Sequence, residues 1–126
     1  MSTVQLTQET FNETVRDNGI VLIDFWAEWC GPCRMFGPVY EEVSTKHEDV
    51  VFAKVDTESE QELAGAFQIT SIPTLMAVRE GVVLYSQAGA LPQADLEKLV
   101  TAIKEVDMEK VHADIAAEQA KQPPSE

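Results

Sequence analysis

The 126-residue chain has the length of one ordinary globular domain, and 44% of its residues are hydrophobic, which is enough to bury a single core. Its 22 acidic and 9 basic side chains give a formal net charge of −13, the wrong sign for binding nucleic-acid phosphates or anionic lipid headgroups. Nucleic-acid binding and membrane-surface binding are therefore excluded from the expected functions.

The first predicted elements are a helix and a buried strand. Thr7 or Thr10 can cap the helix, Thr10 has capping-box spacing to Glu13, and Gly19 should end it. The run at 20–26 is β-branched and aromatic at consecutive positions, a pattern typical of a strand that is buried on both faces of a sheet. We expect it to be a central strand.

A second helix should follow, because Pro32 suits the first turn of a helix, where its missing N–H costs nothing. This helix is predicted to run to about His47. Beyond it the pattern predicts a strand, a short helix and an antiparallel pair of strands joined by a turn at Glu80-Gly81. The expected ranges of these elements are 50–55, 60–67, 75–78 and 82–86.

The last predicted element is an amphipathic helix that begins after Pro92. No glycine or proline follows until Pro123, so we expect one helix from Gln93 to Lys121 that outruns the sheet. The segment beyond Lys104 is either a solvated helical tail without a specific role, or it carries a thin apolar stripe that associates weakly with another copy or a partner. Apart from such weak association, the protein should be a monomer. The stripe consists of Val106, Val111 and Ile115.

This order of elements predicts an α/β fold, with a mixed sheet covered by helices on both faces. We divide the chain into one domain at 1–105 and a C-terminal extension at 106–126, helical and then disordered. Residues 1–20 contain no export signal, and no apolar run approaches the roughly 20 residues that span a bilayer. We therefore expect a soluble, cytoplasmic protein.

The two cysteines, Cys30 and Cys33, lie where the buried strand meets the second helix. Unsatisfied N–H groups and the positive end of the helix dipole favour a thiolate there. We predict that Cys30, which should be the more exposed thiol, is the attacking nucleophile, and that Cys33 resolves the mixed disulfide. The alternatives are two inert packing residues or half of a zinc site. No metal is expected, because His47 and His112 lack paired ligand spacing.

The segment 24–33, with the sequence DFWAEWCGPC, resembles the thioredoxin family. Further residues match the family between about Val4 and Lys104, namely Pro38, Lys54-Val55-Asp56, Ile72-Pro73-Thr74 and Gly89. The resemblance implies a thioredoxin fold and a protein-disulfide reductase that uses a redox-active Cys30–Cys33 disulfide and binds no cofactor. It also implies two kinds of partner: disulfide-containing client proteins, and a flavin-containing, NADPH-dependent thioredoxin reductase that recharges the pair.

The residues between the cysteines, Gly31 and Pro32, favour a reductase within this family. Related isomerases and periplasmic oxidants usually carry histidine at the position of Pro32. The chain departs from the family at Arg34, where lysine is frequent, and at Thr70, where many relatives have arginine. Both departures could change which proteins the chain prefers as partners, but neither touches the reacting cysteines. The alternative function is a thioredoxin-like binding or chaperone module, or an assembly subunit, whose thiols are idle.

Asp24 is a lone carboxylate in an apolar strand, which is costly unless the group is neutral, paired or turned to water at the strand end. The resemblance implies that Asp24 lies beneath Cys33 and accepts its proton. Burial would raise the pKa of Asp24 toward the range of a general base, and Lys54 on the adjacent strand would limit that rise.

The resemblance also implies a surface for extended client chains. The Ile72-Pro73 peptide bond would be cis, although most X-Pro bonds in folded proteins are trans. It would expose the backbone of Ile72 for pairing with a client. Trp29, Ile72, Pro73 and the segment around Gly89 would form an apolar rim around the disulfide. Trp26 is predicted to be a supporting packing residue.

Overall fold

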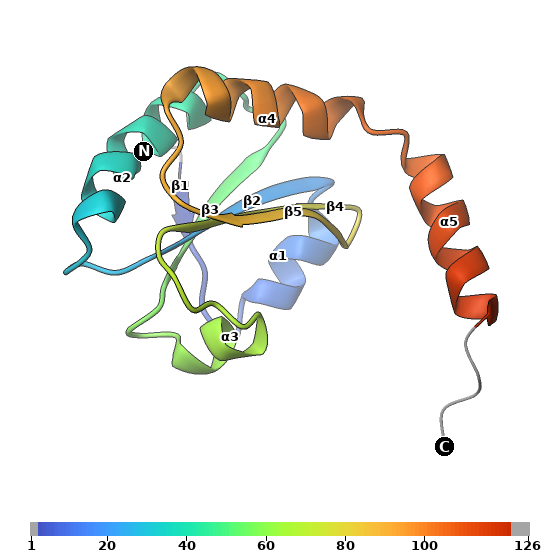
Figure 1. The fold of residues 1–126 in the computed structure, drawn as a ribbon, viewed down its shortest axis with the longest axis horizontal. Helices are drawn as coiled ribbons and strands as arrows, with labels where there is room; N and C mark the ends of the chain where they lie inside the picture. Colours follow the sequence, from blue (N-terminus) through green and yellow to red (C-terminus); the bar gives the residue numbers. More distant parts are fainter. Residues whose placement is uncertain (1–2, 122–126) are drawn as a thin grey trace.

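The computed structural model describes residues 3–121 and shows a mixed five-stranded sheet with helices on both faces (Figure 1). The elements in chain order are β1 (Thr3–Gln5), α1 (Phe11–Asp17), β2 (Ile20–Trp26), α2 (Gly31–Ser44), β3 (Val51–Asp56), α3 (Gln61–Ala66), β4 (Thr74–Arg79), β5 (Val82–Ala88), α4 (Gln93–Glu105) and α5 (Met108–Lys121). The tail predicted to be disordered, 122–126, lies outside the described residues.

The strand order is β1-β3-β2-β4-β5, so β2 is the central strand, as predicted. β1 and β2 both run parallel to β3, whereas β4 is antiparallel to β2 and to β5. The strand β1 was not predicted from the sequence. Its three residues are too few to show a period-two pattern, and only pairing with β3 defines it.

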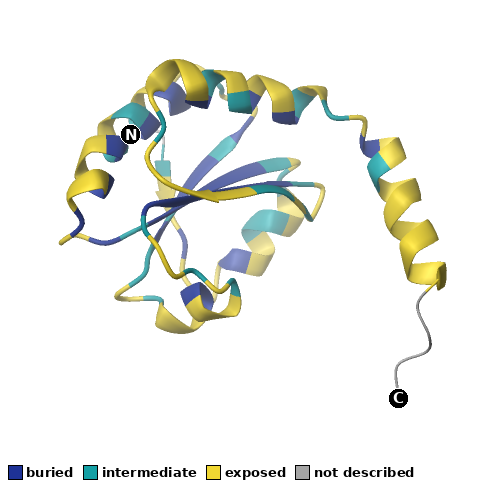
Figure 2. Cartoon of the chain, in the orientation of Figure 1, coloured by how far each residue is buried: buried dark blue, intermediate teal, exposed yellow. Residues whose placement is uncertain are grey.

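Alternate residues of β2 face opposite layers of the fold. Val21, Ile23 and Phe25 pack in the cluster that includes Phe11 and Leu63, on the side of α1 and α3. The residues between them face α2 and α4, where the main core lies, and the inner faces of these helices are buried (Figure 2). That core contains Leu22, Phe36, Tyr40, Val43, Phe52, Leu75, Leu96, Val100 and Ile103. The predicted strand buried on both faces is thereby confirmed.

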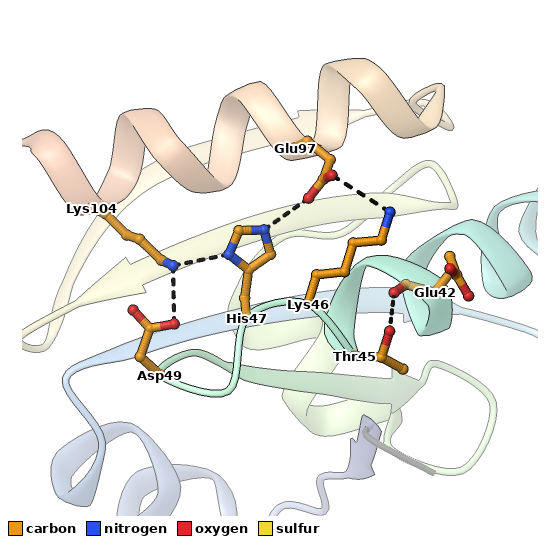
Figure 3. A network of polar contacts seen from close by, with 7 residues as sticks. All are labelled: Glu42, Thr45, Lys46, His47, Asp49, Glu97 and Lys104. Atoms are coloured by element: carbon orange, nitrogen blue, oxygen red, sulfur yellow. Dashed lines mark hydrogen bonds and ion pairs between the residues drawn. The ribbon is translucent and has the colours of Figure 1, made fainter.

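A polar network holds the loop after α2 against α4 (Figure 3). His47 Nε2 contacts Glu97 Oε1 at 2.8 Å, and its Nδ1 lies 2.9 Å from Lys104 Nζ. Lys104 Nζ also donates to Asp49 Oδ1 at 2.9 Å. Since a lysine ammonium only donates, Nδ1 is the acceptor, and the neutral ring must carry its proton on Nε2. The network fixes α4 against the loop that follows α2. The predicted end of α2 near His47 is too late by three residues, because the helix ends at Ser44.

The prediction of one continuous helix from Gln93 to Lys121 is wrong, because the chain breaks at Val106, which is extended with φ −61° and ψ 133°. Two side chains explain the break. Arg79 Nη1 donates to the carbonyls of Ile103, Lys104 and Val106 at 2.9, 3.0 and 2.9 Å, so a cation from β4 caps the end of α4.

Asp107 then begins the next helix. Its Oδ1 accepts the N–H of Lys110 at 3.2 Å, as an N-cap side chain does. Met108 is buried and His112 Nε2 lies 2.9 Å from Glu80 Oε1, which fixes the start of α5 beside the β4–β5 turn. The rest of α5 is largely exposed (Figure 2). The boundary between α4 and α5 is thus marked in the sequence by a capping aspartate, Asp107, and not by the glycine or proline that usually ends a helix.

Candidate active site

Cys30 and Cys33 form a disulfide where β2 leads into α2, with their Cα atoms 5.2 Å apart. Cys30 is the N-cap of α2, and its Sγ accepts the N–H of Cys33 at 3.2 Å. Gly31 and Pro32 occupy the first turn, as predicted from the missing N–H of proline. The sulfur of Cys30 therefore lies against an otherwise unpaired donor at the positive end of the helix.

The expected difference in exposure between the two cysteines is not found. Cys30 is 4% exposed and Cys33 is 5% exposed, because both pack with Ala27 against Trp26 and Ile72. Exposure therefore does not distinguish the attacking thiol from the resolving thiol. The distinguishing feature is the N-cap position of Cys30, whose sulfur receives a helix N–H.

The Ile72–Pro73 peptide bond is cis, as the resemblance implied, and it brings the Ile72 carbonyl oxygen to 3.7 Å from Cys30 Sγ. Because a disulfide sulfur carries no proton, this is a packing contact. The Thr74 hydroxyl donates to the Ser71 carbonyl and holds the loop. Gly89 donates its N–H to the Pro73 carbonyl at 2.8 Å, which ties the end of β5 to the same loop.

The residues of the predicted apolar rim differ in exposure. Trp29 is 64% exposed, Gly89 is exposed and Ile72 is half-buried, whereas Pro73 is buried. Gly89 has φ +114°, a backbone conformation that side chains with a Cβ rarely adopt. The structure thus places these four residues around one disulfide, although they come from three separate loops.

Asp24 is fully buried, and neither carboxylate oxygen has a hydrogen-bond partner among the described residues. The water-facing alternative for this residue is therefore wrong. Burial raises its pKa from 3.8 to about 7, and the positive charge of Lys54, its register partner on β3, limits the rise. Asp24 can thus exchange a proton near neutral pH.

Lys54 also stacks on an aromatic ring, a contact that the sequence analysis missed. Its Nζ lies 4.7 Å from the centre of the Trp26 ring, which is a cation–π contact. Trp26 therefore binds the Lys54 ammonium as well as packing against the cysteines. Trp26, Lys54 and Cys33 line a cavity of about 350 Å³. The parallel register between β2 and β3 places Lys54 beside Trp26, although 28 positions separate the two residues in the sequence.

The two departures from the family pattern lie on the surface. Arg34 is exposed, and its Nε donates to the Glu28 carbonyl at 2.9 Å. Thr70 is exposed on the loop before the cis bond. Within 3–121, no cluster of three or more metal-ligating side chains occurs, and no helix is long and apolar enough to cross a membrane.

Comparison with known proteins finds a matching family model and similar sequences and structures. Residues 2–102 match the family model described as Thioredoxin. A relative from Streptomyces coelicolor that carries a thioredoxin name is 56% identical over 119 residues, which cover 94% of this chain and 89% of the relative. The thioredoxin of Bacillus subtilis is 40% identical over 101 residues, which cover 79% of this chain and 96% of that protein.

Two solved structures confirm the predicted fold. A thioredoxin from Plasmodium falciparum superposes with a TM-score of 0.73 at 34% identity, covering 79% of this chain and 97% of its own. A mutant thioredoxin from Halobacterium salinarum gives a TM-score of 0.76 at 31% identity, covering 83% of this chain and 92% of its own.

Proposed function

Because the chain belongs to the thioredoxin family and is a thiol-disulfide oxidoreductase of the protein-disulfide reductase type, we propose a catalytic cycle in which Cys30, Cys33 and Asp24 have separate roles. The observation that carries the proposal is the disulfide at the start of α2, directly after the central strand β2, which contains a buried carboxyl without a hydrogen-bond partner among the described residues. A binding module with idle thiols would not need that carboxyl.

In the first step of the proposed cycle, the Cys30 thiolate attacks one sulfur of a client disulfide. A bond forms between Cys30 and the client, and the other client sulfur leaves as a thiolate. The N–H of Cys33 and the positive end of α2 stabilise the negative charge on Cys30 before attack.

In the second step, Cys33 loses its proton and attacks Cys30 Sγ. The client leaves as a dithiol, and the Cys30–Cys33 disulfide forms, so two electrons have passed to the client. Asp24 is the proposed acceptor of the Cys33 proton, and its pKa of about 7 suits a base that must both take and return a proton. Lys54, Gly31 and Pro32 support this arrangement without reacting.

Client chains are proposed to bind at the rim around the disulfide. Trp29 provides exposed apolar area, while Ile72 offers its backbone beside Cys30. Gly89 leaves room above the loop, because it has no side chain. An extended client segment could then pair with the backbone of Ile72 while its disulfide meets Cys30. Pro73 positions this backbone from below.

The family implies that the oxidised protein interacts with a reductase, and we propose an NADPH-dependent thioredoxin reductase in the cytoplasm. The test is a coupled assay with NADPH, a bacterial thioredoxin reductase, this protein and insulin as the disulfide client. We expect continuous NADPH oxidation only when all four components are present. Recharging by glutathione, but not by the reductase, would contradict the proposed partner.

We also propose the domain boundary near residue 105, with 106–126 as an extension that self-associates weakly through α5. The match to the Streptomyces relative covers 94% of this chain, so it reaches well into α5. Val111 is half-buried and Ile115 is 36% exposed, which leaves an apolar stripe on a largely uncovered helix. The monomer remains the main species.

Truncation after Lys104 should leave disulfide reduction unchanged, because the disulfide lies at the start of α2 and α5 is on the other side of the molecule from α2 (Figure 1). Sedimentation velocity at increasing concentration should show weak association of the full chain and none of the truncated chain. Monomers of unchanged mass in both proteins would contradict the role of α5. A loss of reductase activity on truncation would contradict the boundary.

A further inference from the structure

A groove beside the disulfide combines an exposed aromatic ring with acidic side chains. It has a volume of about 480 Å³ and is lined by Glu28, Trp29, Arg34, Asp56 and Glu58. Glu58 also lines a second hollow of about 340 Å³, together with Glu60 and Glu62 near the start of α3. The two hollows therefore share Glu58 in their lining, and we refer to them together as the acidic groove.

The charge in the first hollow is not balanced within the protein. The side chains of Glu28 and Glu58 are exposed and have no hydrogen bond or ion pair within the described part of the chain. Arg34 is the single cation among the lining residues, and its Nε is held by the Glu28 carbonyl. Asp56 instead accepts the N–H groups of Glu58 and Ser59, which fixes the loop that carries Glu58.

Trp29 supplies a second kind of attraction for a cation. Its side chain is 64% exposed and lines the same hollow as the two free carboxylates, so a lysine or arginine side chain can lie on the ring and against a carboxylate together. An acidic or neutral segment would gain neither interaction, and an acidic segment would be repelled.

We propose that the acidic groove binds basic segments of client proteins, so that the chain preferentially reduces disulfides flanked by lysine or arginine. This inference rests on the proposed function, because the groove adjoins the disulfide that reacts with the client. The groove does not alter the exchange of bonds and electrons described above. It changes how often a basic client is held with its disulfide near Cys30.

The test uses three synthetic peptides, each with one disulfide, that differ only in whether lysine, glutamine or glutamate flanks the cysteines. The kcat/KM for reduction is measured for each peptide in the coupled assay. We expect the order lysine, glutamine, glutamate at low salt. The differences should shrink strongly near 1 M salt, where the screening length falls to about 3 Å. Equal rates for the lysine and glutamate peptides at low salt would overturn the proposal.

Charge variants separate the groove from the overall negative charge of the protein. Glu28→Gln should lower the lysine-to-glutamate rate ratio by about two- to fivefold, the range for one exposed charge pair, and Glu58→Lys, which reverses a charge, should lower it further. The matched control is Glu105→Lys, an exposed glutamate at the end of α4. Glu58→Lys and Glu105→Lys change the net charge equally, so an equal effect of both would overturn the assignment to the groove.

The glutamine peptide distinguishes the two levels of the proposal. Because it carries no flanking charge, the native protein and all three variants should reduce it at similar rates. If the native protein fails to reduce this peptide, the proposed catalytic cycle is wrong. If the peptide is reduced but the charge order is absent, only the role of the acidic groove is wrong.

Discussion

Replacing Cys30 by serine should lower the rate of disulfide reduction by at least about a thousandfold, since loss of a covalent nucleophile has effects of that size or larger in other enzymes. A serine hydroxyl cannot form the mixed disulfide with the client, so the first bond of the cycle is never made. The measurement is insulin reduction with dithiothreitol as the electron source, compared with the background rate of dithiothreitol alone.

Cys33→Ser is the matched control for this variant. It should also stop turnover, but it should trap a covalent complex with the client, because the first attack still occurs and the resolving thiol is missing. Mass spectrometry under non-reducing conditions should find this complex with Cys33→Ser and none with Cys30→Ser. The reverse result would exchange the roles of the two cysteines. That test matters because their exposed fractions, 4% and 5%, do not distinguish them.

Asp24→Asn should increase the free energy of unfolding above pH 7 by up to about 4 kcal/mol, because each unit of pKa difference corresponds to about 1.4 kcal/mol. The carboxyl has a pKa of about 7 in the folded protein, against an ordinary value of 3.8. Between these values the folded state binds the proton more tightly, so stability falls as pH rises through this window. Asparagine keeps the shape of the side chain and does not ionise.

The gain in stability should therefore depend on pH. Denaturant unfolding of both proteins should give the largest difference above pH 7 and a small one near pH 4. A difference that stays constant with pH would contradict the raised pKa. Asp49→Asn is a suitable control, because Asp49 is exposed and its hydrogen bond with Lys104 lowers its pKa. That variant should give no gain at high pH.

The same Asp24→Asn variant should slow the release of the client from the mixed disulfide. The loss of activity should be partial, because water can accept the Cys33 proton less efficiently. The pH profile of the native protein should contain a group that titrates near 7, and the variant should lack it. An identical profile in both proteins would mean that Asp24 takes no part in proton transfer.

The parts of the structure that could be predicted from sequence are those with a local signal. The apolar run at 20–26 predicted the central strand, and the cysteine spacing predicted a reactive pair at a helix start. The burial of Asp24 followed from its place within that run. The cis bond before Pro73 came from the resemblance to a family and not from any property of the two residues.

The remaining features depend on contacts between distant segments. The break at Val106 combines the local cap by Asp107 with a contact from Arg79 of β4, and sequence propensity alone favoured a continuous helix. The contact of Lys54 with Trp26 needs the register of β2 and β3. The similar burial of Cys30 and Cys33 depends on Ile72, which lies in another loop.

The capping of α4 by Arg79 has a practical consequence for attaching labels. Arg79, which caps the end of α4, pairs with Ile20 at the start of β2, whereas the disulfide follows the end of that strand. The helix α5 therefore begins at the end of the molecule opposite the start of α2 (Figure 1). A fluorophore or a surface linker placed near Lys121 would leave the disulfide facing outward. The protein could then be immobilised by this helix while large substrates still approach it freely.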